Sequence, residues 1–360
     1  MKVVVALTDM KAGVRCTALA VLAGAVALGA AGAGAAGAGA VAARASAAAA
    51  GPAVVPVAIV AAAAALAGAA VATLAAGCGL VLWQSYRVSH PPRVASGRTP
   101  AEVGLAHEEF TVRAGGVPIR GWRVPAAAAG KPARGTVVLC HFLGGGKESL
   151  LRQIAFLAGG GWDVVAFDFR NHGQSGHDPW WRFRLDDDLR AVLDWVRPRA
   201  AGRPVALVGL SMGASAAALV AAGDPGVAAL VLDSGPLVLS REYFFRLYGL
   251  TGLPRSRALR WLFMQSFLVG GGFGGLAGRV ERALASLAPR PALFIHGERD
   301  QVIPRANSDR LFREFAREPK EYWRVPHSHH LTNYALDPEQ YAARVRGFLD
   351  RYLPAKGEMG

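Results

Sequence analysis

The stretch that decides the fold is VALVGLSMGASAAALVAAG, residues 205–223. Its first six residues are apolar and predict a buried strand, and the small residues that follow predict a helix. Ser211 lies between them, with Gly209 two residues before it and Gly213 two residues after it. Such a turn strains the serine backbone and exposes its hydroxyl above the helix N-terminus. We therefore predict a nucleophilic serine, with a simple helix-capping serine as the alternative.

Apolar runs of the same kind recur on both sides of this stretch, separated by segments with helical periodicity. They cover residues 136–141, 162–170, 229–235, 292–300 and 320–326, and residues 108–126 read as two more strands around a Gly-Gly turn. Near-continuous apolar strands that alternate with helices are typical of a mostly parallel sheet with helices on both faces. Residues 237–288 contain aromatics and glycines but no strand pattern, and they predict a helical lid insertion.

Several polar residues follow the carboxyl ends of these strands, where functional sites form in α/β sheets. The first buried strand runs into HFLGGG, residues 141–146, and a later strand runs into HGERDQVIP, residues 296–304. The last predicted strand ends at VPHSHHLTNY, residues 325–334, which holds three histidines. A serine, a carboxylate and a histidine at strand ends are the components of nucleophilic catalysis.

Together these segments resemble the α/β-hydrolase superfamily over about residues 100–355. The resemblance implies a serine hydrolase with Ser211 as nucleophile, Asp300 as acid and His330 as general base, in the order Ser, Asp, His. It also implies an oxyanion hole made of the backbone N–H groups of Leu143 and Met212. Phe142 stands where this superfamily commonly has glycine, which is a departure from its pattern.

Other residues compete for these roles. Asp233, after the fourth parallel strand, is the rival acid, and His329 is the rival base. Asp168 and His172, in FDFRNHGQS, look structural by resemblance. His327 and His329 stand where the superfamily usually has glycines, so a metal site is conceivable there. No carboxylate or cysteine lies at ligand spacing nearby, so we expect no metal and no cofactor.

The first 95 residues differ in composition from the rest of the chain, because they are rich in Ala and Gly and poor in charge. The stretch from Val57 to Trp83 is long and apolar enough for a membrane helix, with Tyr86 and Arg87 placed for its interface. Residues 16–43 are a second membrane helix, a signal-like sequence or a low-complexity extension. LAAGC, residues 74–78, faintly resembles a lipoprotein processing site. We expect residues 1–95 to form the membrane segment or segments and a linker, read from HPPRVASGRTP (residues 90–100), that leads to a hydrolase domain over residues 96–356. We expect anchoring in a bacterial-type cell membrane, and the sequence leaves open which side of the membrane the hydrolase domain faces.

Charge and cysteine usage narrow the possible partners. The formal net charge is +14, but the arginines are scattered and form no basic run with interleaved aromatics. The first explanation of this positive charge is a solvated surface, the second is binding to an anionic membrane surface, and the last is binding to nucleic acid. We therefore expect no nucleic-acid partner. The cysteines are Cys16, Cys78 and Cys140, and they suggest no disulfide framework.

Three hypotheses about function follow. The first is a membrane-anchored serine hydrolase that cleaves small or lipid-like acyl esters, as carboxylesterases and lipases do. The second is a peptidase of the same fold, similar to serine aminopeptidases, because esters and amides use the same triad and oxyanion hole. The third is a non-catalytic binding protein, which the presence of Ser211, Asp300 and His330 argues against.

Overall fold

The computed structural model describes residues 54–93, 96–127, 132–179, 184–237, 241–266 and 278–353. Its chain divides into two units. One consists of Met1–Tyr86 with Phe244–Ser266, and the other of Arg87–Tyr243 with Phe267–Gly360. The second unit contains the sheet and every residue of the predicted catalytic site.

A mixed, mostly parallel sheet forms the centre of the second unit. Among the described residues it has eight strands in the order β1-β2-β4-β3-β5-β6-β7-β8. The strands β1 and β2 and the strands β2 and β4 pair antiparallel, and all other pairs are parallel. The strands are β1 (Glu108–Ala114), β2 (Val117–Val124), β3 (Thr136–Cys140), β4 (Asp163–Phe167), β5 (Val205–Leu210), β6 (Val227–Asp233), β7 (Ala292–Gly297) and β8 (Lys320–Val325). This confirms the predicted fold class.

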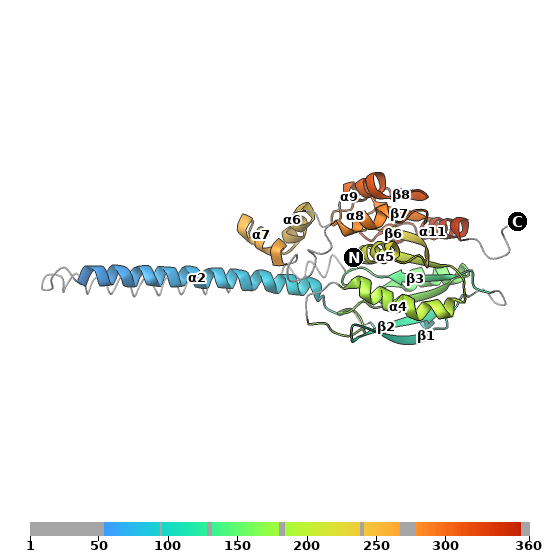
Figure 1. The fold of residues 1–360 in the computed structure, drawn as a ribbon, viewed down its shortest axis with the longest axis horizontal. Helices are drawn as coiled ribbons and strands as arrows, with labels where there is room; N and C mark the ends of the chain where they lie inside the picture. The colour runs from blue at the N-terminus through green and yellow to red at the C-terminus, as the bar shows by residue number, and fades with distance from the viewer. Residues whose placement is uncertain are drawn as a thin grey trace. The chain divides into compact units, whose positions relative to one another are not determined.

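Helices cover both faces of this sheet (Figure 1). One face packs against α4 (Leu185–Ala200), α5 (Met212–Ala222) and α8 (Arg279–Ala285), and the other against α3 (Leu151–Gly159) and α11 (Pro338–Tyr352). Short elements complete the unit: η1 (Pro100–Val103), η2 (Lys147–Leu150), α9 (Arg305–Arg310), η5 (Leu311–Phe315) and α10 (Asn333–Leu336). The strands β3, β4 and β5 are buried throughout, because parallel strands covered on two faces are apolar on both sides.

The segment before β1 lies against the body of the second unit. The His90 Nε2 lies 2.8 Å from the backbone oxygen of Asp178, and the Ser96 N–H donates to the Glu148 carboxylate over 2.6 Å. Pro100, at the start of η1, is buried. The sequence predicted a linker here, and the structure shows that its described part is held by specific contacts.

In its described part, the first unit contains most of a long apolar helix, α2 (Val54–Ser89). Its residues Ile59–Leu80 are long and apolar enough to cross a membrane, and most large apolar side chains in that range are exposed: Ile59, Val60, Leu66, Val71 and Leu74. The unit also contains α7 (Arg257–Gln265) and most of α6 (Arg241–Leu250), which belong to the predicted insertion. The predicted apolar segment at 16–43 lies outside the described residues.

Candidate active site

Ser211 occupies the turn between β5 and α5 in a strained backbone conformation. Its φ is 52° and its ψ is −108°, in a region that L residues rarely adopt. The strain persists because the turn is over-determined by close packing. A Cβ on Gly213 would lie 2.1 Å from the Cys140 carbonyl oxygen, and one on Gly209 would lie 2.4 Å from the Gly213 oxygen. The two glycines therefore let helix and strand approach closely enough to raise the serine hydroxyl out of the turn.

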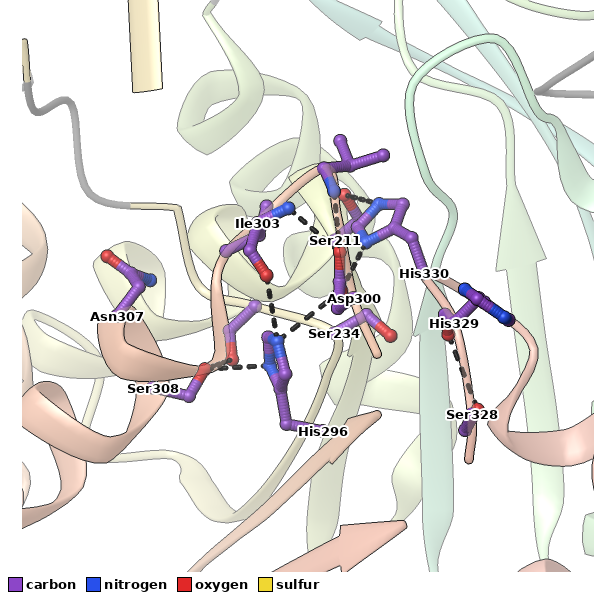
Figure 2. Close-up of polar contacts among 12 residues, drawn as sticks. Ser211, Ser234, His296, Asp300, Ile303, Asn307, Ser308, Ser328, His329 and His330 are labelled. Carbon is purple, nitrogen blue, oxygen red and sulfur yellow. Dashed lines mark hydrogen bonds and ion pairs between the residues drawn. The ribbon is translucent and has the colours of Figure 1, made fainter. Parts of the chain in front are cut away.

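His330 reaches this hydroxyl from the loop after β8. Its Nε2 lies 3.0 Å from the Ser211 Oγ, and its Nδ1 lies 2.7 Å from the Asp300 Oδ2 (Figure 2). A carboxylate only accepts hydrogen bonds, so the Nδ1 carries the proton and donates it to Asp300. The Nε2 is then the acceptor for the serine hydroxyl, which is the arrangement of a general base.

Asp300 is a buried carboxylate at the turn after β7. Its Oδ1 accepts hydrogen bonds from the backbone N–H groups of Val302 and Ile303, each over 2.9 Å. These two donors fix the plane of the carboxylate, so the Oδ2 faces His330. The turn therefore both neutralises part of the buried charge and orients it.

The other two histidines of the loop do not join this group. His329 is exposed, its Nδ1 lies 3.1 Å from the backbone oxygen of Arg299, and its ring lies apart from Ser211 and Asp300 in Figure 2. His327 is also exposed and has a φ of 60°. The structure thus brings His330, and not its neighbours, to the serine. Among the described residues no group of three or more His, Cys, Asp or Glu lies close enough to hold a metal ion.

Asp233, the rival acid, faces a different set of partners. Its carboxylate accepts from the Asn333 amide over 2.6 Å, the Tyr341 hydroxyl over 2.8 Å and the Ser234 hydroxyl over 2.9 Å. Burial raises the pKa of this carboxyl group, while the three hydrogen bonds act in the opposite direction. Ser234 also accepts from the Leu331 N–H over 3.2 Å. Asp233 therefore ties the histidine loop and α11 to the end of β6, whereas the His330 imidazole is held by Asp300.

The oxyanion loop after β3 is held by His141. The His141 Nε2 accepts from the Phe169 N–H over 2.9 Å, so its Nδ1 carries the proton and donates to the Phe142 carbonyl over 2.8 Å. Burial lowers the pKa of His141, which favours this neutral form. The Phe142 ring lies against Gly145, where a Cβ would come within 2.8 Å of it. Phenylalanine at the usual glycine position is therefore accommodated by a glycine three residues later.

Leu143 and Met212 supply the two N–H groups expected to hold an oxyanion. Leu143 lies in the loop after β3, and Met212 is the first residue of α5. Within the described part of the chain neither N–H donates a backbone hydrogen bond. Both remain available to an incoming oxygen, and the position of Met212 adds the positive end of a helix dipole.

Asp168 and His172 belong to a buried cluster beside this loop. The Asp168 carboxylate accepts from the Lys147 ammonium over 2.6 Å, and both side chains are 1% exposed. The His172 Nδ1 lies 2.9 Å from the backbone oxygen of Arg170. Burial, reinforced by nearby His141, lowers the pKa of His172 to about 3. His172 is therefore neutral and engaged in packing, as the resemblance implied.

Sequence reasoning missed three residues near the site: His296, Asn333 and Tyr341. His296 contacts Asp300, whereas Asn333 and Tyr341 contact Asp233. The sequence held one signal of the His296–Asp300 contact, which is that the two residues are four positions apart. The two partners of Asp233 lie 100 and 108 residues from it, so no local pattern indicated them.

Comparisons with known proteins agree with the hydrolase fold of this unit. Residues 131–269 match the Hydrolase_4 family, described as serine aminopeptidase S33. The uncharacterized protein YfhR of Salmonella typhimurium is 28% identical over 280 residues, which cover 73% of this chain and 86% of YfhR. The uncharacterized protein YqkD of Bacillus subtilis is 28% identical over 221 residues, covering 60% of this chain and 71% of YqkD.

Solved structures show the same fold. The esterase Pf2001 of Pyrococcus furiosus has a TM-score of 0.61 at 23% identity, covering 73% of this chain and 97% of the esterase. The α/β hydrolase GrgF from Penicillium sp. sh18 has a TM-score of 0.54 at 21% identity, covering 69% of this chain and 99% of GrgF. At these identities the likeness establishes the fold, and the activity must be argued from the site.

Proposed function

Because the chain belongs to the α/β-hydrolase superfamily, we propose that it is a membrane-anchored serine hydrolase that cleaves acyl esters. The observation that carries the proposal is the chain of hydrogen bonds from Ser211 through His330 to Asp300. A strained serine that donates to a histidine, itself oriented by a buried carboxylate, is what nucleophilic catalysis requires.

The proposed reaction proceeds through an acyl-enzyme. The Ser211 Oγ attacks the ester carbonyl carbon while its proton passes to the His330 Nε2, and Asp300 stabilises the imidazolium that results. The Leu143 and Met212 N–H groups bind the oxyanion of the tetrahedral intermediate. As the intermediate collapses, His330 gives the proton to the departing alcohol. A water molecule then attacks the acyl-serine, with His330 as base again, and the carboxylic acid leaves.

A peptidase of the same fold is the second candidate, because the matched family is described as serine aminopeptidase. The similar protein from Pyrococcus furiosus is named an esterase, which favours the ester. A panel of p-nitrophenyl esters of increasing acyl length, tested beside aminoacyl p-nitroanilides, distinguishes the two. We expect turnover of the esters and little of the anilides. The reverse preference would replace the esterase by the peptidase.

The membrane anchor is proposed from α2. Residues Ile59–Leu80 could span the hydrocarbon core, and Trp83 and Tyr86 follow at the position where aromatic residues gather at membrane interfaces. An anchor of this kind suits lipid-like acyl substrates. We expect the full chain to stay with membranes after alkaline carbonate extraction, and a chain that begins at Arg87 to be released. Release of the full chain by carbonate would remove the anchor from the proposal.

The catalytic proposal is tested with a fluorophosphonate probe on the full chain in detergent. We expect an adduct on Ser211 by peptide mass spectrometry, and no adduct in Ser211→Ala or His330→Ala. His329→Ala is the matched control, because His329 lies in the same loop but contacts the Arg299 backbone, so its labelling should persist. An unlabelled, folded wild-type chain, or labelling that survives His330→Ala but not His329→Ala, would contradict the assignment.

A further inference from the structure

His296 is a fully buried histidine behind Asp300 that the proposed acyl-transfer steps do not use. It lies near the end of β7. Its Nε2 lies 3.0 Å from the Ile303 carbonyl oxygen and 3.4 Å from the Asp300 Oδ2. Its Nδ1 lies 2.9 Å from the Ser308 hydroxyl (Figure 2). Both ring nitrogens of this imidazole are therefore in use.

The partners fix which nitrogen carries the proton. A carbonyl and a carboxylate only accept, so the Nε2 of His296 is the donor and the Nδ1 accepts from the Ser308 hydroxyl. Burial lowers the pKa of His296, which keeps the imidazole neutral although Asp300 acts in the opposite direction. The Nε2–H therefore donates to the Ile303 carbonyl, and the 3.4 Å approach to Asp300 is a contact between a neutral polar ring and a carboxylate, not a second ion pair.

We propose that His296 is a positioning residue that holds Asp300 from behind, both directly and through the turn that carries it. The direct contact is electrostatic: the polar Nε2–H edge of His296 lies 3.4 Å from the Asp300 Oδ2, the oxygen that also accepts from His330. The indirect contact fixes the Ile303 carbonyl, and the N–H of the same Ile303 fixes the Asp300 Oδ1. Both carboxylate oxygens are then immobilised with the Oδ2 aimed at the base. The proposal rests on the proposed function, in which Asp300 orients His330.

Ser308 on α9 extends this arrangement toward the nucleophile. Its hydroxyl also lies 3.5 Å from the Gly235 carbonyl oxygen, and a Cβ on Gly235 would lie 2.8 Å from the backbone carbonyl oxygen of Ser211. The neighbouring Asn307 donates from its side-chain amide to the Pro236 carbonyl over 2.9 Å. Asn307 therefore ties α9 to this turn by a hydrogen bond, whereas the single hydroxyl proton of Ser308 goes to the His296 imidazole. This pair supplies a matched control.

The first experiment measures ester hydrolysis by the full chain in detergent. Loss of the donor in His296→Phe should lower kcat on the order of 100-fold with KM within about twofold, because a small misplacement of an orienting group costs about that much. His296→Gln keeps an N–H donor at a similar reach and should recover kcat to within about tenfold of the wild type. Ser308→Ala should lower kcat by about tenfold, and Asn307→Ala by less than about twofold. Equal losses in Ser308→Ala and Asn307→Ala, or no loss in His296→Phe, would overturn the proposal.

A double-mutant cycle separates positioning from a general structural role. If His296 acts through Asp300, the effect of His296→Phe should fall below about threefold when Asp300 is already Asn. Urea unfolding of each variant shows whether the loss follows stability instead. A full effect of about 100-fold in the Asp300→Asn background would show that His296 acts on activity by another route and would refute the proposal.

A spectroscopic test does not depend on the substrate. Nitrogen-15 NMR of histidine-labelled full chain should show a neutral His296 at about pH 7 with the proton on Nε2. In Ser308→Ala the Nδ1 signal should shift as its hydrogen bond is lost. A protonated His296, or one with the proton on Nδ1, would overturn the proposal even if the chain hydrolyses esters. If the chain hydrolyses none of the esters tested while His296 shows the expected tautomer, the failure lies with the proposed function.

Discussion

Substitution of Asp300 by asparagine should remove most of the activity, because the turn dictates how the new amide must lie. The Val302 and Ile303 N–H groups both donate to the Oδ1 position, and only the amide oxygen can accept them. The amide NH₂ is therefore forced to the Oδ2 position, 2.7 Å from the His330 Nδ1. His330 must then move its proton to Nε2, where it can no longer accept the Ser211 proton.

The size of this effect follows from the same geometry. A wrong imidazole tautomer in a Ser-His-Asp triad lowers kcat by about 10⁴-fold, which is about 5.4 kcal/mol of transition-state stabilisation at 25 °C. The assay is hydrolysis of p-nitrophenyl butyrate by the full chain in detergent, with the fold checked by circular dichroism. An Asp300→Asn enzyme with activity close to that of the wild type, within about tenfold, would refute the assignment of this acid.

Asp233→Asn provides the comparison. The Asp233 carboxylate accepts from Asn333, Tyr341 and Ser234 through both of its oxygens. An amide there has one oxygen and one NH₂ group, so at least one of these buried donors would face a donor instead of an acceptor. That mismatch costs about 1–3 kcal/mol of stability, measured by urea unfolding. We expect kcat to fall by less than about tenfold, since this carboxylate supports the histidine loop and does not hold the imidazole. A loss as large as that of Asp300→Asn would restore Asp233 as the acid.

Three further predictions concern stability. Lys147→Met leaves the buried Asp168 carboxylate unpaired and should lower the free energy of unfolding by about 3–5 kcal/mol, with the double variant that adds Asp168→Asn recovering part of it, as measured by urea denaturation. Because the pKa of His172 is lowered from 6.5 to about 3, the unfolded chain binds a proton in that window that the folded chain does not. Stability should therefore fall as the pH drops below about 6.5, by up to about 1.4 kcal/mol per pH unit from this group, and His172→Gln should flatten the slope; an unchanged slope would contradict the assignment. Gly213→Ala forces a Cβ onto a backbone carbonyl of β3 and should cost about 3 kcal/mol as well as activity, whereas Gly223→Ala, with open space around it, should change thermal stability little.

The sequence predicted those parts of the site that depend on local pattern. The strand, serine and helix of residues 205–223 define the nucleophile turn without tertiary information, because period and glycine spacing are local properties. The resemblance to the α/β-hydrolase superfamily assigned the acid and the base, because it implies that they follow strands in the order Ser, Asp, His. The structure brings these residues together, and it separates His329 from them by the course of the backbone in the loop.

The supporting shell could not be predicted in the same way. Asp233 read as a candidate acid because its neighbours in space, Asn333 and Tyr341, come from segments far along the chain. His296 read as the end of a strand, because its four-residue spacing from Asp300 is too common a pattern to indicate a contact by itself. The contacts of Ser96 and His90 with the hydrolase unit were also hidden, because a segment rich in turn residues looks like a linker whether or not it is held in place.

The separation of base and nucleophile along the chain has a consequence for biosynthesis. His330 is 119 residues from Ser211, and Tyr341, which helps to hold its loop, comes later still. A ribosome that has already delivered α2 and the serine turn must translate this whole interval before the base exists. Until then the nascent chain carries Ser211 without His330, so the apolar helix emerges well before the candidate triad can form. On the proposed function, the order of synthesis therefore separates the candidate membrane anchor in time from a complete triad.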